Sequence, residues 1–234
     1  MTRVEIEAPG DPVRDALMLL DGAVAAGRRA ILGIAGSPAS GKTSLVEWLI
    51  RELTLLRPGL VGHVGMDAFH LAGSVLLTRG TALVKGAAET FDAPGYAALL
   101  MRLRSERDHA VFAPVFHREI EDSIAHEAEI GPEVALVVTE GNYLLSEREP
   151  WPAVRVLLDR TWFLELDETV RIERLIARHM RYGRSRAEAM ERAKGSDLVN
   201  ANLVRGDAQR ADAVVEWSDG DGSWRLRPRL HPDA

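Results

Sequence analysis

The sequence predicts an α/β fold with a mostly parallel sheet flanked by helices. Short apolar strands alternate with amphipathic helices along the chain, which is the pattern of successive β-α-β units. The run 134–139 is continuously apolar, as expected for a strand that helices cover on both faces of a parallel sheet. The stretch from Gly36 to Thr43 fits G-x-x-x-x-G-K-[ST] at every fixed position and lies between a strand and a helix.

The first part of the chain predicts a helix, a strand and a second helix. Asp11 and Pro12 suit the N-cap and first position of the opening helix. A strand over 30–35 follows, and the next helix is expected to end near Arg57. Both helices are predicted from apolar residues at helical spacing: Val13, Leu17, Leu20 and Val24 in the first, and Leu45, Val46, Trp48, Leu49 and Leu53 in the second.

The rest of the chain is expected to complete a single domain over residues 1–218. The stretch 68–133 is less regular and predicts a substrate-side insertion, while residues 219–234 predict a peripheral tail. The expected strands are 60–66, 110–116, 134–139, 161–166 and 213–217, and the expected helices are 96–103, 168–182 and 186–210.

Gly36 to Thr43 predicts a loop that binds phosphate. Gly36 and Gly41 let the backbone turn so that its amide groups point inward, and the following helix directs its positive end to the same place. Lys42 would reach the β and γ phosphates of a nucleoside triphosphate, and the Thr43 hydroxyl would bind the accompanying Mg²⁺. The expected nucleotide-binding residues are Gly36, Ser37, Pro38, Ala39, Ser40, Gly41, Lys42, Thr43 and Ser44.

Two acidic residues follow predicted strands, at the edge of the sheet where ligands of α/β proteins bind. Asp67 could accept a proton from a substrate hydroxyl that attacks the γ-phosphate, or it could be an ordinary strand-end acid or helix cap. Glu140 follows the most apolar strand. It could hold Mg²⁺ directly or through water, polarise the nucleophile, or cap the following turn.

Three arginines form a basic stripe on the helix expected over 168–182. Arg174, Arg178 and Arg181 are spaced i, i+4, i+7 and lie just before Gly183, whose turn could release a mobile segment. Their guanidinium groups could clamp the transferring phosphate after a flap closes. The alternative is a solvated charged face that pairs with Glu173 and other acids.

The histidines of the insertion have no metal-binding spacing, so no zinc site is predicted. They are His70, His117 and His126. His70 and His117 could instead bond substrate hydroxyls, or be surface or core histidines. Four phenylalanines could wall a small pocket or form plain core: Phe69, Phe91, Phe112 and Phe116.

The composition limits the classes of partner and compartment. The 234 residues carry a formal net charge of −6, and phosphate backbones need clustered Lys and Arg, so no nucleic-acid surface is expected. There are no cysteines, which excludes disulfides and thiolate chemistry. No apolar run approaches membrane-spanning length, and residues 1–12 contain no export signal. We therefore expect a cytoplasmic protein without a membrane partner, and a homodimer stays open.

The ordered motifs resemble the uridine kinase, phosphoribulokinase and bacterial pantothenate kinase family of P-loop small-molecule kinases. Residues 67–70 look like the D-x-F-[YH] segment, and 85–92 are similar to the K-G-x-P-E-[ST]-[YF]-D stretch of pantothenate kinases. Residues 114–118 look like the P-x-[YF] element, 138–141 like the E-G strand end, and 174–184 like the arginine-bearing lid. The departures are His70 and Phe116 in place of tyrosines of uridine kinases, Ala88 in place of proline, and His117 in place of an aspartate used in nucleoside recognition.

These departures favour a nucleoside or sugar kinase-like branch, sometimes labelled as fructose-transport-associated kinases. The resemblance implies a P-loop NTPase fold with a five-stranded parallel core, a lid over about 174–188, and ATP and Mg²⁺ as cofactors. It implies that Asp67 is the general base, that Lys42 and Thr43 bind phosphate and Mg²⁺, and that Glu140 aids the metal. The lid arginines would stabilise the transition state. The residues expected to face the acceptor are Asp67, His70, Lys85, Asp92, Phe116, His117 and Arg118.

The sequence therefore predicts an ATP-dependent kinase that phosphorylates a hydroxyl of a nucleoside-, pantothenate- or sugar-like small molecule. One alternative is a P-loop ATPase or nucleotide-dependent switch in which water replaces the alcohol, although the chain has no N-K-x-D guanine-reading segment. Another is a nucleotide-binding regulator without turnover. Against it stand four intact residues, Lys42, Thr43, Asp67 and Glu140. The acceptor and the preference for ATP over GTP stay open.

Overall fold

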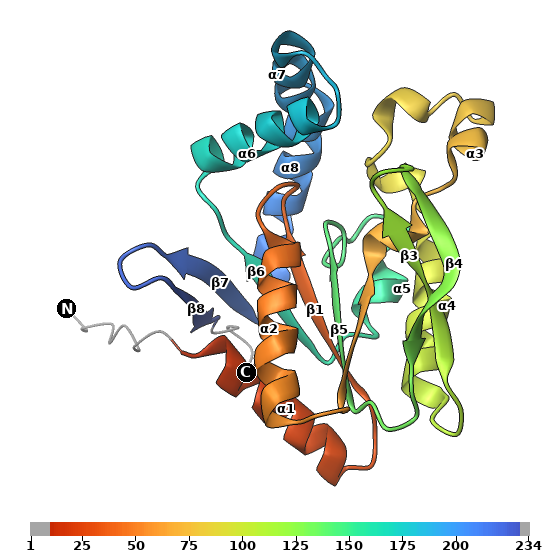
Figure 1. Ribbon diagram of the computed structural model, residues 1–234, viewed down its shortest axis with the longest axis vertical. Coiled ribbons are helices and arrows are strands. Elements are labelled where there is room, and N and C mark those ends of the chain that lie inside the picture. Colours follow the sequence, from red (N-terminus) through yellow and green to blue (C-terminus); the bar gives the residue numbers. More distant parts are fainter. Residues whose placement is uncertain (1–9, 230–234) are drawn as a thin grey trace.

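A computed structural model describes residues 10–229 of the chain. The first residues of the expected domain, 1–9, and the end of the expected tail, 230–234, lie outside the described part. Two sheets and a set of surrounding helices make up this part (Figure 1).

The main sheet contains six strands in the order β2-β5-β1-β6-β7-β8. The first five strands of this order are parallel, and β8 pairs antiparallel with β7. The mostly parallel α/β fold expected from the sequence is therefore confirmed, with an antiparallel edge strand added. The bounds are β1 Ala30–Gly36, β2 Val61–Gly65, β5 Leu136–Gly141, β6 Arg160–Leu164, β7 Ala213–Ser218 and β8 Ser223–Pro228.

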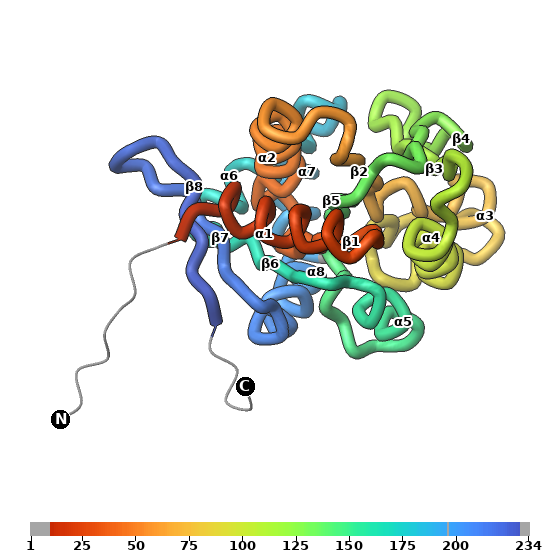
Figure 2. The backbone as a smooth tube through the Cα atoms, turned by 90° about the horizontal axis from the view of Figure 1, so that it is seen from below, coloured from red at the N-terminus to blue at the C-terminus, as the bar shows by residue number. Residues whose placement is uncertain are grey.

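Helices cover both faces of this sheet. One apolar cluster joins α1 and α2 to one face, and a second joins α4, α5 and α8 to the other. Figure 2 shows α2 on one side of the strands and α5 on the other. No helix in the described part of the chain has the length and apolar character that crossing a bilayer requires. The bounds are α1 Pro12–Ala25, α2 Lys42–Leu56, α3 Gly73–Thr78, α4 Ala93–Ser105, α5 Pro152–Arg155, α6 Glu168–Arg181, α7 Arg186–Lys194 and α8 Ser196–Gly206, with short 3₁₀ helices η1 Met66–Phe69, η2 Ala82–Val84, η3 Ala88–Thr90 and η4 Ala208–Arg210.

The opening helix α1 begins as the sequence predicts but buries a different stripe. The Asp11 carboxylate accepts a hydrogen bond from the Val13 amide at 2.8 Å, and Pro12 occupies the first turn. The expected apolar face is wrong for Val24, which is 49% exposed. Small residues let the helix lie close to the sheet, so the fully buried stripe is Ala16, Leu20 and Ala23.

The insertion contains a two-stranded antiparallel sheet that the sequence reveals only in part. The strand β3 (Val111–His117) was expected, and it pairs with β4 (Asp122–Ile130), which was not. Most of β4 is polar and exposed, so its apolar pattern is weak. Its pairing with β3 forms a hairpin whose turn includes Glu121 in a left-handed conformation, at φ +52°.

The single helix expected over 186–210 is wrong. The chain breaks at Gly195, whose backbone angles of φ −96° and ψ −112° are not helical, and α7 and α8 form on either side. The glycine marks this break, since glycine adopts such conformations at little steric cost.

Residues 223–228, expected in a peripheral tail, instead form β8 and extend the main sheet. Leu226 of β8 is 2% exposed and belongs to the apolar cluster under α1 and α2. The chain before α1 also reaches this strand, because the backbones of Gly10 and Leu226 exchange two hydrogen bonds of 2.7 and 2.9 Å.

Leu226→Ala is therefore expected to lower the free energy of unfolding by about 2–4 kcal/mol, because it leaves a cavity in the core. Urea denaturation measures the change. The matched control is Leu77→Ala, since Leu77 is 73% exposed and its loss should cost less than about 0.5 kcal/mol. Equal, small effects of the two substitutions would show that β8 adds nothing to the core.

Candidate active site

The loop between β1 and α2 wraps around the side chain of Lys42. Gly41 has φ +100°, a conformation that suits glycine, and Lys42 begins α2. The Lys42 ammonium donates hydrogen bonds to the carbonyl oxygens of Gly36 at 2.9 Å and Ser37 at 3.2 Å. It also donates to Asn142 Oδ1 at 2.7 Å, and Lys42 as a whole is 8% exposed. The loop therefore holds a nearly buried positive charge at the N-terminus of a helix.

Two carboxylates balance this buried charge. Burial lowers the pKa of Lys42, and Glu140 and then Asp67 oppose that change. Burial, followed by the negative charge of Asp67, raises the pKa of Glu140 to about 7. Lys42 and Arg118 counteract this rise. The three groups therefore share one electrostatic environment, although Lys42, Asp67 and Glu140 are far apart in the sequence.

Strand pairing brings the two carboxylates to the same edge of the sheet. Glu140 of β5 pairs in register with Gly65 of β2, and Asp67 follows Gly65 by two residues, in η1. A Cβ atom at Gly65 would lie 3.5 Å from Glu140 Oε1, so the Glu140 carboxylate lies directly beside the end of β2. The neighbouring Thr139 hydroxyl donates to the Val64 carbonyl at 2.6 Å and fixes the register from the other face.

Arginines from two directions converge on Asp67. Arg118, which follows β3, donates to Asp67 Oδ2 at 3.0 Å. Arg178 of α6 lies near enough that burial and then Arg118 lower its pKa, while Asp67 raises it. The candidate base Asp67 therefore lies close to two cations, Arg118 and Arg178.

Aromatic rings line the side of Asp67 that faces the insertion. The His70 ring lies 4.0 Å from that of Phe91 and 4.9 Å from that of Phe116, measured between centroids. Its Nδ1 lies 2.8 Å from the Asp67 carbonyl oxygen, which can only accept, so Nδ1 carries the proton. Burial lowers the pKa of His70 and keeps the ring neutral, which leaves Nε2 as a hydrogen-bond acceptor.

Helix α6 is tied to the loop by an arginine that the sequence analysis did not single out. Arg171 is 1% exposed, donates to the Pro38 carbonyl at 3.2 Å and pairs with Glu168 at 2.7 Å. One turn later, Arg174 Nη1 lies 3.4 Å from the position that a Cβ at Gly41 would take. The basic stripe begins three residues before Arg174, and this spacing could have revealed Arg171.

Asn142, the third partner of Lys42, was also missed. It follows Glu140 and Gly141 directly, so its signal was a polar residue at the end of an apolar strand. Thr43 and Ser44 are exposed in the first turn of α2.

Other predicted site residues have local partners instead. The Asp92 carboxylate accepts from the Gly95 amide at 2.9 Å and caps α4, and His117 Nε2 lies 2.6 Å from Glu127 Oε2 across the hairpin. Arg181 is exposed at the end of α6. Phe112 is 46% exposed and does not share the buried position of Phe91.

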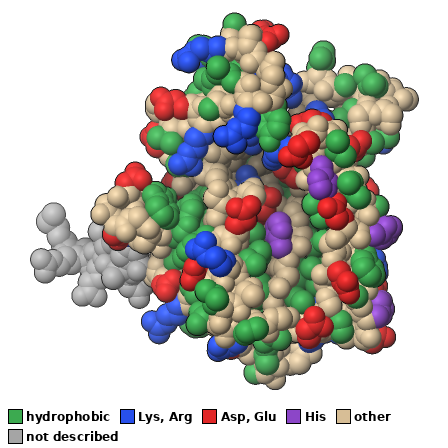
Figure 3. Space-filling model, viewed as in Figure 1, with side chains coloured by type: hydrophobic (Ala, Val, Ile, Leu, Met, Phe, Trp, Pro, Cys, Tyr) green, Lys and Arg blue, Asp and Glu red, His purple; other side chains and the backbone are tan. Residues whose placement is uncertain are grey.

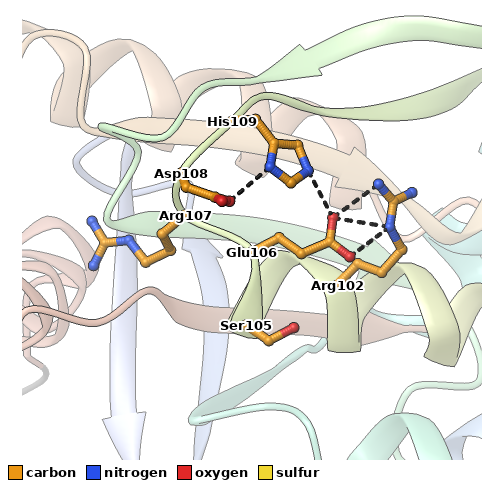
Figure 4. Close-up of a pocket in the computed structure, with 6 residues that line it drawn as sticks. All are labelled: Arg102, Ser105, Glu106, Arg107, Asp108 and His109. Atoms are coloured by element: carbon orange, nitrogen blue, oxygen red, sulfur yellow. Dashed lines mark hydrogen bonds and ion pairs between the residues drawn. The ribbon is translucent and has the colours of Figure 1, made fainter.

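These elements surround a hollow at the carboxyl edge of the sheet. Figure 3 shows it between the helices at the top of the molecule and the body, with Lys and Arg side chains at its upper margin. A different surface pocket lies at the far end of α4 (Figure 4). It is about 20 Å along the helix from Asp92. Its charges pair with each other, for example Arg102 with Glu106 at 3.0 Å and His109 with Asp108 at 2.7 Å.

The lysine-bearing loop between β1 and α2, on a parallel sheet, defines a P-loop nucleotide-binding protein. No family model matches the chain. The ATP-dependent kinase-like protein notR' of Aspergillus versicolor is 35% identical over 169 residues, which are 68% of this chain and 95% of that protein. A crystal structure from Silicibacter sp. TM1040, assigned as a fructose transport system kinase, is 32% identical with a TM-score of 0.76, covering 89% of this chain and 100% of that one.

The kinase YFH7 from Saccharomyces cerevisiae shares the fold, with a TM-score of 0.75 at 18% identity over 87% of this chain and 97% of that one. The chain belongs to the family of P-loop kinases that includes uridine kinase, phosphoribulokinase and pantothenate kinase. This confirms the resemblance read from the motifs. The relatives named as kinases support the class of phosphotransferase for this protein.

The buried Glu140 predicts a specific dependence of stability on pH. Its pKa is higher in the folded protein than the ordinary 4.5, so its contribution to stability is present below pH 4.5 and is lost as the pH rises through about 7. The glutamine in the Glu140→Gln variant stays neutral at every pH, so the variant should not show this loss of stability. The variant should therefore lose less stability than the unaltered protein as the pH rises from 4 to 8, in urea denaturation without Mg²⁺ or nucleotide.

The control for this experiment is Glu191→Gln, which neutralises an exposed glutamate of α7. Its difference from the unaltered protein is measured over the same range, from pH 4 to 8. A Glu140→Gln difference that varies with pH no more than this control difference would contradict the raised pKa.

Proposed function

We propose that this protein transfers the γ-phosphate of ATP to a hydroxyl of a small nucleoside-, pantothenate- or sugar-like acceptor. The observation that carries the proposal is the convergence of Lys42, Glu140 and Asp67 at the carboxyl edge of the sheet. A loop that only binds nucleotide needs the lysine. It does not need a second carboxylate beside a cation and an aromatic wall.

In this proposal the loop from Gly36 to Ser44 binds the triphosphate. Phosphate oxygens would replace the Gly36 and Ser37 carbonyls as partners of the Lys42 ammonium, because charged acceptors bind an ammonium more strongly. Arg174 lies at the mouth of the loop, and Arg178 and Arg181 follow it on α6. We assign these arginines to the phosphates and to a lid over about 174–188, whose turn contains Gly183 at φ +90°.

The residues at the loop fit a magnesium ion. Mg²⁺ prefers oxygen ligands and keeps several waters, so one hydroxyl and one carboxylate beside the phosphates suffice. Thr43, exposed in the first turn of α2, and Glu140 would hold it. The ion would neutralise charge on the β and γ phosphates. Its binding would also keep Glu140 ionised despite burial.

Asp67 is assigned as the general base. The acceptor oxygen forms a bond to the γ-phosphorus, the bond between that phosphorus and the β,γ-bridging oxygen breaks, and the hydroxyl proton passes to the Asp67 carboxylate. ADP and a phosphomonoester result. His70 Nε2 can accept a hydrogen bond from another hydroxyl of the acceptor, since Nδ1 is the protonated nitrogen. Asp92 and His117 have structural partners, so we assign them a supporting role on the acceptor side.

The test of the proposed function is ADP release from MgATP in the presence of a panel of nucleosides, sugars, vitamins and hydroxy acids. Release should depend on one class of alcohol, and ³¹P NMR should detect the phosphomonoester. Equal ATP hydrolysis with and without every alcohol would favour the alternative of an ATPase or nucleotide-dependent switch.

Asp67→Asn should lower turnover by roughly 10²–10⁴-fold while ATP affinity stays nearly the same, because the amide cannot accept the proton. Steady-state kinetics and calorimetric titration with a non-hydrolysable ATP analogue measure the two effects. The control is Asp108→Asn, which changes a side chain that is 87% exposed in the remote pocket. Normal turnover of Asp67→Asn would remove Asp67 from the role of base.

A further inference from the structure

Two positive side chains lie against the ring of Phe116. Lys85 Nζ is 5.5 Å from the ring centroid, and the guanidinium carbon of Arg118 is 5.8 Å from it. Each cation is attracted by the aromatic ring, and the two positive charges share this one uncharged neighbour. Two positive charges beside one ring favour a negative group near them.

Each of these cations has one carboxylate partner within the described part of the chain. The Lys85 ammonium donates to the Glu121 carbonyl and lies 3.8 Å from Glu121 Oε2, on a side chain that is 60% exposed. Arg118 binds only one oxygen of Asp67, through one of its nitrogens. The pair between Lys85 and the exposed Glu121 carboxylate contributes little, so a ligand anion can replace it.

The surroundings make this position more attractive to an anion. The rings of Phe116, His70 and Phe91 are uncharged and pack together beside the two cations, so they lower the local dielectric. Arg178 adds a third positive charge from α6. Asp197, a further carboxylate near Arg178, is bonded to His179 at 2.7 Å.

We propose that Lys85 and Arg118, over the ring of Phe116, form an anion subsite, so that the acceptor is an alcohol bearing a carboxylate or phosphate group. The inference rests on the proposed function and names the substrate class for that site. An anion that engages the Arg118 fork with two oxygens is a better partner than one oxygen of Asp67. Binding of the acceptor would thus withdraw Arg118 from Asp67 Oδ2 and free that oxygen to take the hydroxyl proton.

The experiment measures binding of three probes with one carbon skeleton: glycerate, glycerol 1-phosphate and glycerol. Calorimetric titration is done on the protein saturated with Mg²⁺ and a non-hydrolysable ATP analogue, so that the γ-phosphate position is already occupied. At least one anionic probe should bind at least about 10-fold more tightly than glycerol, and the two anions show whether carboxylate or phosphate is preferred. Equal binding of all three probes, or no binding of either anion, would overturn the subsite.

Variants locate the effect. Lys85→Met and Arg118→Met should each weaken binding of the anionic probe by about 10-fold, and Arg118→Lys should lie between. The control Arg102→Met removes an arginine that is 48% exposed and pairs with Glu106 in the pocket of Figure 4. Unchanged anion affinity in both methionine variants would contradict the proposal.

The two proposals fail in different ways. If the anions bind through Lys85 and Arg118 but no alcohol ever releases ADP, the subsite stands and the kinase reaction does not. If alcohols release ADP and the preferred acceptor is neutral, with a KM that is unchanged in Lys85→Met and Arg118→Met, the reaction stands and the subsite is overturned.

Discussion

The arrangement at the carboxyl edge of the main sheet depends on the burial of one ammonium group. A charge that leaves water is costly unless oxygen atoms and opposite charges surround it. Lys42 has Gly36 and Ser37 carbonyls from its own loop, Asn142 beyond β5, and the negative charges of Glu140 and Asp67. These groups belong to three neighbouring strands or the segments after them. The carboxyl ends of the three strands must therefore lie side by side, and the register between β2, β5 and β1 places them so.

The same edge holds like charges close together, which is unfavourable for the folded chain alone. Burial and Asp67 raise the pKa of Glu140, and burial and Arg118 lower that of Arg178. Such conflicts gather at functional sites because the ligand resolves them. In the proposed reaction, the phosphates and their metal ion meet Lys42, Arg178 and Glu140. An anionic acceptor would pair with Arg118. Each group that is repelled by a neighbour in the free protein would then be attracted to a reactant of opposite charge.

A chain of contacts connects this edge with the helices above it. Arg171 joins the loop at Pro38 to Glu168 at the start of α6, and Glu168 also pairs with Arg205 of α8 at 3.0 Å. The base of the helical segment is therefore fixed to the loop, whereas its far end passes through Gly183 at φ +90° before α7. Beyond this turn, Arg192 of α7 donates to the Lys85 carbonyl at 3.2 Å, so the outer part of the segment contacts the insertion.

The sequence by itself determined the loop, the strand before it, the helix after it and the parallel fold, because a phosphate-binding turn and a buried strand are each specified by consecutive residues. It also placed Asp67 and Glu140 at strand ends. Only the tertiary structure decided which side chains meet: β4 and β8 gain their hydrogen bonds and burial from distant strands, and Arg171 and Asn142 find partners far along the chain. Asp92 and His117 lie in family motifs as Arg118 does, yet Asp92 caps a helix and His117 pairs across the hairpin. Local spacing encodes backbone conformation, whereas the choice of partner depends on packing between segments that the sequence keeps apart.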